Sequence, residues 1–122
     1  MIRDLAVRQA EAGAAWLDVN AGTRSSSEPD DLVWLIKTIQ PVVDIPLCLD
    51  SANPQAVAAG IQVVEHPPMV NSISGDPQRV QGLLPLVAEH KCTVIALAMD
   101  GTRIPETCDG RLEVARRLMA QT

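Results

Sequence analysis

The chain has 122 residues, of which 47% are hydrophobic and 20% are charged, so we expect one small globular domain rather than a disordered segment. The net charge is −5 and no dense cluster of Lys or Arg is present, which argues against nucleic acid or an anionic membrane as a partner. No apolar run reaches the roughly 18 residues of a membrane span and no signal peptide is recognisable. Because the three cysteines also lie far apart, we expect a cytoplasmic protein without a metal site.

The first half of the chain alternates predicted helices and strands. Apolar residues at helical spacing predict a helix over residues 2–14, and a short apolar segment predicts a strand over 16–19. Segment 25–40 opens with Ser, Glu, Pro and Asp, which is typical of a helix N-terminus because acids stabilise the positive end of the helix dipole. A second apolar strand is expected over 46–50, followed by a helix over 53–64.

The second half continues this alternation. A strand over 69–72 precedes a helix over 76–91, in which Pro85 is expected to kink or restart the helix because proline removes a backbone hydrogen bond. The most β-branched strand is expected over 93–98, and a last helix is expected over 108–121.

The order of these elements predicts an α/β fold of parallel βα units. Two architectures fit: a small doubly wound sheet of about five strands, or about half of a (β/α)8 TIM barrel, which needs roughly 250 residues. We favour the half-barrel with four strands, because the chain opens and closes on a helix and polar residues follow every strand. These polar residues are Asp18, Asn20, Asp50, Ser51, Asn71, Ser72 and Asp100. In a barrel such strand ends converge on the face that holds the active site.

Four segments at the successive strand ends resemble a known family. They are "GAAWLDVNAG", "PLCLDSANPQAVAAG", "MVNSISGD" and "TVIALAMDGTRIPETCDGRLEVARRLM", and together they are similar to the pterin-binding domains of methyltetrahydrofolate:corrinoid methyltransferases and to the folate domain of cobalamin-dependent methionine synthase. Dihydropteroate synthase shares the fold that this resemblance implies. Its Gly-Glu-Ser-Thr-Arg-Pro-Gly-like loop is replaced here by "NAGTRSSSEPDD", and its Asn-Asp pair by Asn71-Ser72.

The resemblance implies a pterin site at the strand ends, to which this chain contributes Asp18, Asn20, Asp50, Asn71, Ser72 and Met99. Asp50 would accept hydrogen bonds from the amino-pyrimidinone N–H groups, because a carboxylate offers two acceptors to two adjacent donors. Asn71 would donate and accept on the mixed edge of the ring. Asp18 and Asn20 would support the pocket floor, and Ser72 and Met99 would line the pocket.

The reaction implied by the resemblance is transfer of the N5-methyl group of methyltetrahydrofolate to the cobalt of a corrinoid protein. A tertiary amine leaves poorly, so N5 must gain a proton or a strong hydrogen bond as the methyl group departs. This chain has no Asp-x-His-x-x-Gly motif, so we expect the corrinoid, or cobalamin, to be held by a partner protein. Parent enzymes of this kind are expected to be homodimers.

By resemblance the chain shows only the second to fifth of eight barrel strands. We therefore expect residues 1–122 to be a partial pterin-binding barrel domain that lacks the first strand and the last three. The residue that assists N5 is then expected outside this chain. Two alternatives remain open: a dihydropteroate synthase-like pterin enzyme, and a non-catalytic small α/β binding domain.

Several polar and bulky residues have structural interpretations. A helix cap or a turn, without ligand contact, is favoured for Asn53, Asp76 and Asp109, whereas Asp100 fits an Asp-Gly turn as well as a pocket role. The three cysteines are predicted to be small core residues, and the two tryptophans are predicted to pack between a strand and its helix. Arg111, Arg116 and Arg117 are predicted to form a solvated helix face. The cysteines are Cys48, Cys92 and Cys108, and the tryptophans are Trp16 and Trp34.

Overall fold

A computed structural model describes residues 1–101 and 103–122 of the chain. One helix precedes four βα units, as the sequence predicts. The elements are α1 (Ile2–Glu11), β1 (Leu17–Val19), α2 (Glu28–Ile39), the 3-10 helix η1 (Gln40–Val42), β2 (Leu47–Asp50), α3 (Pro54–Ile61), β3 (Met69–Ile73), α4 (Pro77–His90), β4 (Thr93–Ala96) and α5 (Cys108–Gln121). None of the helices in the described part of the chain combines the length and the apolar character that a membrane span requires.

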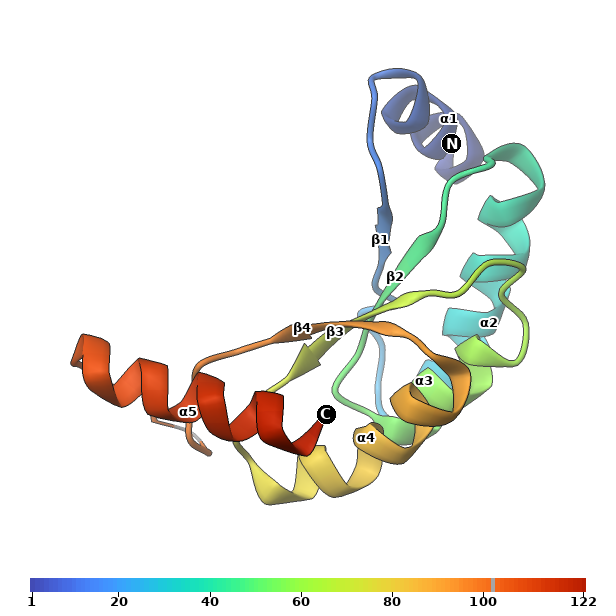
Figure 1. Cartoon of the computed structure of the whole chain (residues 1–122). Coiled ribbons are helices and arrows are strands. Elements are labelled where there is room, and N and C mark those ends of the chain that lie inside the picture. The colour runs from blue at the N-terminus through green and yellow to red at the C-terminus, as the bar shows by residue number, and fades with distance from the viewer. Residues whose placement is uncertain (102) are drawn as a thin grey trace.

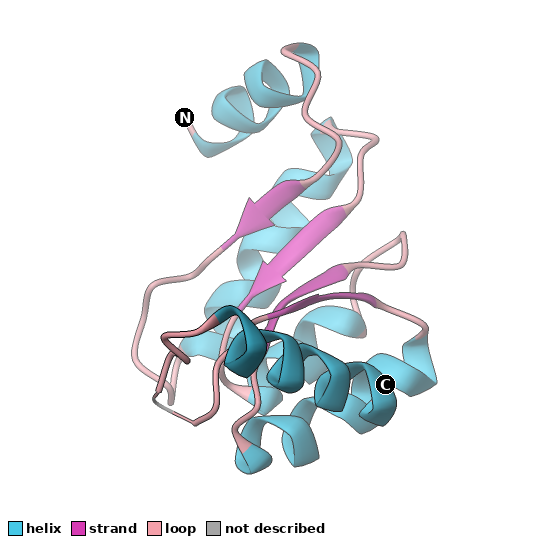
Figure 2. Cartoon of the chain, turned by 60° about the vertical axis from the view of Figure 1, so that its left-hand side comes forward, coloured by secondary structure: helices cyan, strands magenta, loops and turns pink. Residues whose placement is uncertain are grey.

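The four strands form one parallel sheet in the order β1-β2-β3-β4. Each strand thus pairs with its neighbour in the sequence, and β1 and β4 form the two edges of this sheet (Figures 1 and 2). The sheet is curved, and the helices lie along its convex side while the concave side is uncovered (Figure 1). The predicted α/β fold of parallel βα units is confirmed, in the arrangement of half of a (β/α)8 barrel.

The convex side of the sheet carries the hydrophobic core. Successive residues of a strand point to opposite faces, so the buried Leu17 and Val19 of β1 face the helices while Asp18 between them is exposed. The same side receives buried aliphatic side chains from β2, β3 and the helices. The largest of these fully buried side chains are Leu32, Ile36, Leu49, Val57, Val70, Ile73 and Leu83.

Helices α2 and α3 pack closely over β2 because α3 has a glycine at the contact. A Cβ atom on Gly60 would lie 3.0 Å from Cδ1 of Leu49 and 3.2 Å from Cδ1 of Ile36. The side chains of Leu49 and Ile36 are completely buried at this contact, and each stabilises the fold by about 1.5–3 kcal/mol through its removal from water. This close packing fixes the position of β2 against the helices, and thereby the position of Asp50, its last residue.

Three helix N-termini are capped by polar side chains. Asn53 Oδ1 accepts a hydrogen bond from the backbone N–H of Gln55 at 3.0 Å, and Asp76 caps α4 in the same way, so both predictions are confirmed. Asp109 does not cap α5. Thr107 caps α5 by accepting from the N–H of Gly110 at 3.0 Å, and Asp109 lies within the first turn.

The helices α1, α2 and α3 are shorter than their predicted ranges, and the end of β4 also differs from the prediction. Strand β4 ends at Ala96 rather than at residue 98, although the N–H of Leu97 still donates to the carbonyl of Ile73 at 2.7 Å. Helix α4 continues through Pro85 from Pro77 to His90, so of the predicted kink or restart the restart does not occur. Pro85 and Gln81, whose carbonyl loses its helical donor, are both exposed, so water can satisfy this carbonyl.

Two packing predictions are also wrong. The Trp34 side chain is not packed between α2 and a strand, because the residue is 57% exposed. Its neighbours Leu32 and Ile36 are the buried residues of this helix, and a side chain two positions away points to the other side. Cys108 is exposed at the start of α5 rather than part of the core.

Candidate functional site

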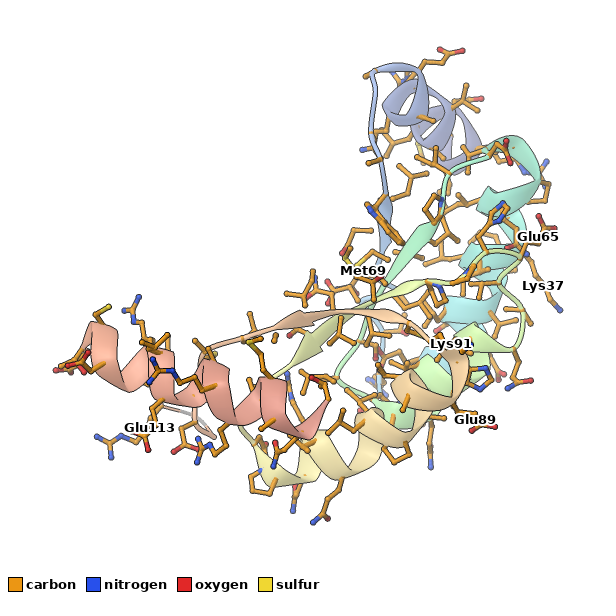
Figure 3. All side chains as sticks on the ribbon, in the orientation of Figure 1. Lys37, Glu65, Met69, Glu89, Lys91 and Glu113 are labelled. Atoms are coloured by element: carbon orange, nitrogen blue, oxygen red, sulfur yellow. The ribbon has the colours of Figure 1, made fainter. Side chains whose placement is uncertain are left out.

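The concave face of the sheet carries the polar residues that the sequence singled out. Register pairs place Asp18 beside Cys48 on the neighbouring strand, and Asp50 beside Asn71. Paired residues share a face, and this face is opposite to the one that packs on the helices. Met69, which pairs with Cys48, points toward the uncovered concave side in Figure 3, whereas Lys37 and Glu89 project outward from the helices.

Two carboxylate–amide hydrogen bonds connect the ends of the first three strands. Asn20 Nδ2, just beyond β1, donates to Asp50 Oδ2 at the end of β2 over 3.0 Å. Asn71 Nδ2, on β3, donates to Asp18 Oδ2 on β1 over 3.3 Å. Four of the predicted site residues are therefore brought together into one cluster, which we call the carboxylate–amide cluster: Asp18, Asn20, Asp50 and Asn71. Strand-end position and the family resemblance together indicated Asp50 and Asn71, and the resemblance indicated Asp18 and Asn20, for which the residues alone favoured a structural role. The structure adds their pairing.

The loop after β1 is fastened to the loop after β2. The Ser51 hydroxyl donates to the Glu28 carboxylate at the start of α2 and also accepts from the backbone N–H of Asn53 at 3.0 Å. Asn53 Nδ2 donates to the carbonyl of Ser25 over 3.1 Å. From the sequence, Glu28 was predicted only as an acid at a helix N-terminus. The polar residue Ser51, directly after β2, was the feature that could have indicated a hydrogen-bond partner for it. These bonds hold the backbone that directly follows Asp50.

Cys48 lies inside this face and was not predicted as part of the site. It is buried, with 3% of its surface exposed, and burial raises the pKa of its thiol from 9.0 to about 12. A hydrogen bond and the negative charge of Asp18 add to this pKa shift, followed by the charge of Asp50. At neutral pH Cys48 is therefore an uncharged thiol between two carboxylates. The sequence feature that could have indicated Cys48 is its spacing: it lies two residues before Asp50, and residues two apart on a strand lie on the same face.

Ser72 and Met99 lie at the same edge but outside the hydrogen bonds of the cluster. Ser72 is buried within β3, with 7% exposure. Met99 follows β4, and its backbone carbonyl accepts from the N–H of Gly75 at 2.7 Å, which joins the loops after β3 and β4. Their predicted role as pocket-lining side chains stays a prediction.

Asp100 has a structural role in the loop after β4. Its backbone N–H and carbonyl exchange hydrogen bonds of 2.9 Å with Arg103, which closes a tight turn. Its carboxylate lies 3.2 Å from Nη2 of Arg117 on α5. Arg111 also has a partner, because its Nε donates to the carbonyl of Pro105 at 2.8 Å. All three arginines of the predicted solvated face of α5 are exposed, and Arg111 and Arg117 also fasten the loop after β4 to this helix.

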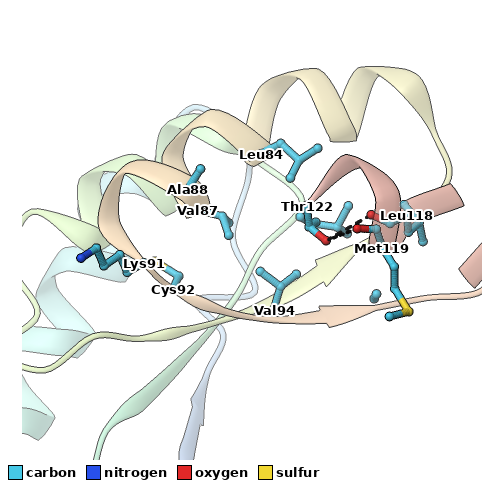
Figure 4. A pocket seen from close by; sticks show the side chains of 11 residues that line it. Leu84, Val87, Ala88, Lys91, Cys92, Val94, Leu118, Met119 and Thr122 are labelled. Atoms are coloured by element: carbon cyan, nitrogen blue, oxygen red, sulfur yellow. Dashed lines mark hydrogen bonds between the residues drawn. The ribbon is translucent and has the colours of Figure 1, made fainter. Parts of the chain in front are cut away.

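A separate apolar groove lies on the helix side of the sheet, between α4 and α5 (Figure 4). Its volume is about 470 Å³, and its lining includes Leu84, Val87, Val94 and Leu118, with Lys91 as the one charged side chain. Because it is lined by aliphatic groups and lies on the opposite face from the carboxylate–amide cluster, it is not the predicted site. Within residues 1–101 and 103–122, no three His, Cys, Asp or Glu side chains are grouped to hold a metal ion.

A parallel α/β sheet with carboxylates and amides near the carboxyl ends of neighbouring strands places the chain in the class of α/β-barrel-like proteins, in which that edge is the usual location of the active site. The sequence matches the family described as pterin binding enzyme over residues 1–120. The chain belongs to this family, and the predicted resemblance is confirmed.

Three relatives agree with this family. A methylcorrinoid:tetrahydrofolate methyltransferase of Eubacterium limosum is 36% identical, and the match covers 98% of this chain and 45% of that relative. The methionine synthases of Mycobacterium leprae and Mycobacterium tuberculosis are 29% and 27% identical, and each match covers 95% of this chain and 10% of the synthase. The chain thus spans less than half the length of these relatives. The similarity to the methyltransferase and to the two methionine synthases extends over nearly the whole of this chain.

Proposed function

We propose that the carboxylate–amide cluster binds the pterin ring of a tetrahydrofolate, in an enzyme that transfers the N5-methyl group of methyltetrahydrofolate to the cobalt of a corrinoid protein. The observation that carries this proposal is the side-by-side placement of Asp50 at the end of β2 and Asn71 within β3. Asp50 is held by Asn20 just beyond β1, and Asn71 by Asp18 on β1. The family match and the methyl-transferring relatives support it.

The cluster offers the hydrogen-bonding pattern that a pterin edge needs. Asp50 is half-buried and uses Oδ2 toward Asn20, which leaves Oδ1 to accept from a ring N–H or from the exocyclic amino group. Asn71 supplies an amide that donates and accepts, beside Asp50 in the register of the sheet. Charge-assisted bonds to a carboxylate are stronger than bonds between neutral groups, so Asp50 contributes most of the ring recognition.

The contribution of this chain to the chemistry is binding and orientation. Fixing the ring in one plane also fixes N5 and its methyl group relative to the cobalt of a corrinoid carried by a docked partner protein. In the name of the Eubacterium limosum relative the corrinoid carries the methyl group and tetrahydrofolate receives it. The same ring site serves either direction, because both directions share one transition state. We further propose that residues 1–122 contribute four strands to a larger pterin-binding barrel domain, in keeping with the 45% coverage of that relative.

Calorimetric titration with methyltetrahydrofolate tests the proposed site. We expect saturable micromolar binding by the wild-type chain, and a loss of roughly 10- to 100-fold in affinity for Asp50→Ala and for Asn71→Ala, because each removes hydrogen bonds to the ring. Asp44→Ala is the matched control, since it removes an exposed carboxylate before β2, at the opposite end of the strand. Circular dichroism verifies that each variant is folded. Absence of binding by a folded wild-type chain, or wild-type affinity in Asp50→Ala, overturns the proposal.

A further inference from the structure

The side-chain amide of Asn20 has a fixed orientation. Its Oδ1 accepts a hydrogen bond from the backbone N–H of Gly22 at 2.7 Å, in a turn that Gly22 closes with a positive φ of 65°. Because the carbonyl oxygen is committed to this turn, the amide nitrogen is committed to the other side. There Nδ2 donates to Asp50 Oδ2 at 3.0 Å. The donor that meets Asp50 is therefore aimed by the backbone of the loop itself.

The consequence falls on the carboxylate of Asp50. Asp50 is the last residue of β2, so its backbone is set by the sheet, but its side chain is free to rotate unless something holds it. The hydroxyl of the next residue, Ser51, is directed to Glu28 instead. The Asp18 carboxylate on the same face favours rotation away from itself, because like charges repel. The amide of Asn20 thus fixes one oxygen of Asp50 and leaves the other to the ligand.

We propose that Asn20 is a positioning residue, which orients the Asp50 carboxylate for the pterin edge without contacting the ring. This inference rests on the proposed function of the carboxylate–amide cluster. A purely structural role for Asn20 would be to accept the hydrogen bond from Gly22 in the turn. The turn and the orientation of Asp50 use different atoms of the Asn20 side chain. The turn needs only an acceptor oxygen, which Asp supplies as well as Asn does. Orientation of Asp50 needs an N–H donor, which Asp lacks.

Two substitutions separate these roles. In Asn20→Ala both the turn acceptor and the donor to Asp50 are lost, and we expect the affinity for methyltetrahydrofolate to fall about tenfold. In Asn20→Asp the turn acceptor is kept, but a carboxylate faces the Asp50 carboxylate, and we expect a loss of about 100-fold at neutral pH. Gln62→Glu is the matched control: it makes the same amide-to-carboxylate change at an exposed residue at the C-terminal end of α3, away from the cluster, and its affinity should stay within about twofold of wild type.

Calorimetry on the full chain and the two Asn20 variants decides the inference. The order wild type, then Asn20→Ala, then Asn20→Asp in decreasing affinity supports the positioning role. Near-wild-type binding by Asn20→Asp together with weakened binding by Asn20→Ala assigns Asn20 to the turn alone and overturns it. Should Asn20→Asp fail to fold, Asn20→Ala decides instead, because unchanged affinity in that variant overturns the inference. A wild-type chain that binds no methyltetrahydrofolate overturns the proposed function as well, which distinguishes that failure from the others.

Discussion

Alkaline pH is expected to destabilise the fold through one buried thiol, Cys48. The thiol has a pKa of about 12 in the folded chain, against 9.0 as its ordinary value in the unfolded chain. Below pH 9 both states keep the proton, so the full stability is present. Above pH 9 the unfolded state releases the proton and the folded state retains it, so unfolding becomes more favourable by about 1.4 kcal/mol per pH unit until the native pKa is reached.

Urea denaturation of the wild type and of Cys48→Ala at pH 7 and pH 10 measures this effect. The difference in unfolding free energy between the two proteins should change by about 1.4 kcal/mol between these pH values, because groups common to both cancel. Cys108→Ala, which removes an exposed thiol, controls for the loss of a sulfur atom. A wild-type minus Cys48→Ala difference that is the same at pH 7 and pH 10 would refute the reasoning.

Two further predictions concern the loops that carry the site. Gly75→Ala should lower the unfolding free energy by about 1–3 kcal/mol, because the new Cβ would lie 2.5 Å from the Met99 carbonyl oxygen, to which the Gly75 N–H also donates; equal urea midpoints for variant and wild type would contradict this. Asn53→Ala should cost about 1 kcal/mol or more by removing the cap of α3 together with the hydrogen bond to Ser25, whereas Asn53→Asp, which retains the capping oxygen and loses only the bond to Ser25, should be destabilised less. Equal destabilisation by both Asn53 substitutions would show that the cap is not the cause.

Local pattern predicted the elements and their order because each rests on short-range physics. Helical spacing, an Asn-Pro or Asp-Pro start and apolar strands are visible in the chain itself, and the caps at Asn53 and Asp76 followed from them. The polar strand ends were expected to gather, because the carboxyl ends of parallel strands share one edge. The four residues of the carboxylate–amide cluster do so.

The remaining features depend on contacts that no local pattern encodes. Which amide meets which carboxylate is decided by sheet register and curvature, so the partnership of Asn71 with Asp18 was out of reach. The position of Trp34 was different, since its spacing from Leu32 and Ile36 already indicated the exposed side of α2. Strand alternation likewise indicated that Cys48 shares a face with Asp50. Its hydrophobic character favoured a core position, and it is indeed buried, but on the concave face beside Asp18.

The hydrogen bond between Asn71 and Asp18 joins β1 to β3 across the intervening strand β2. Neighbouring strands are about 4.8 Å apart, so the two backbones are separated by roughly 10 Å in a flat sheet, and the side chains meet only if the sheet bends toward them. The distance between Asn71 Nδ2 and Asp18 Oδ2 therefore depends on how strongly the sheet is curved. Any motion that flattens the sheet must break this hydrogen bond, and it must then release Asn71 and Asp18 at the same moment.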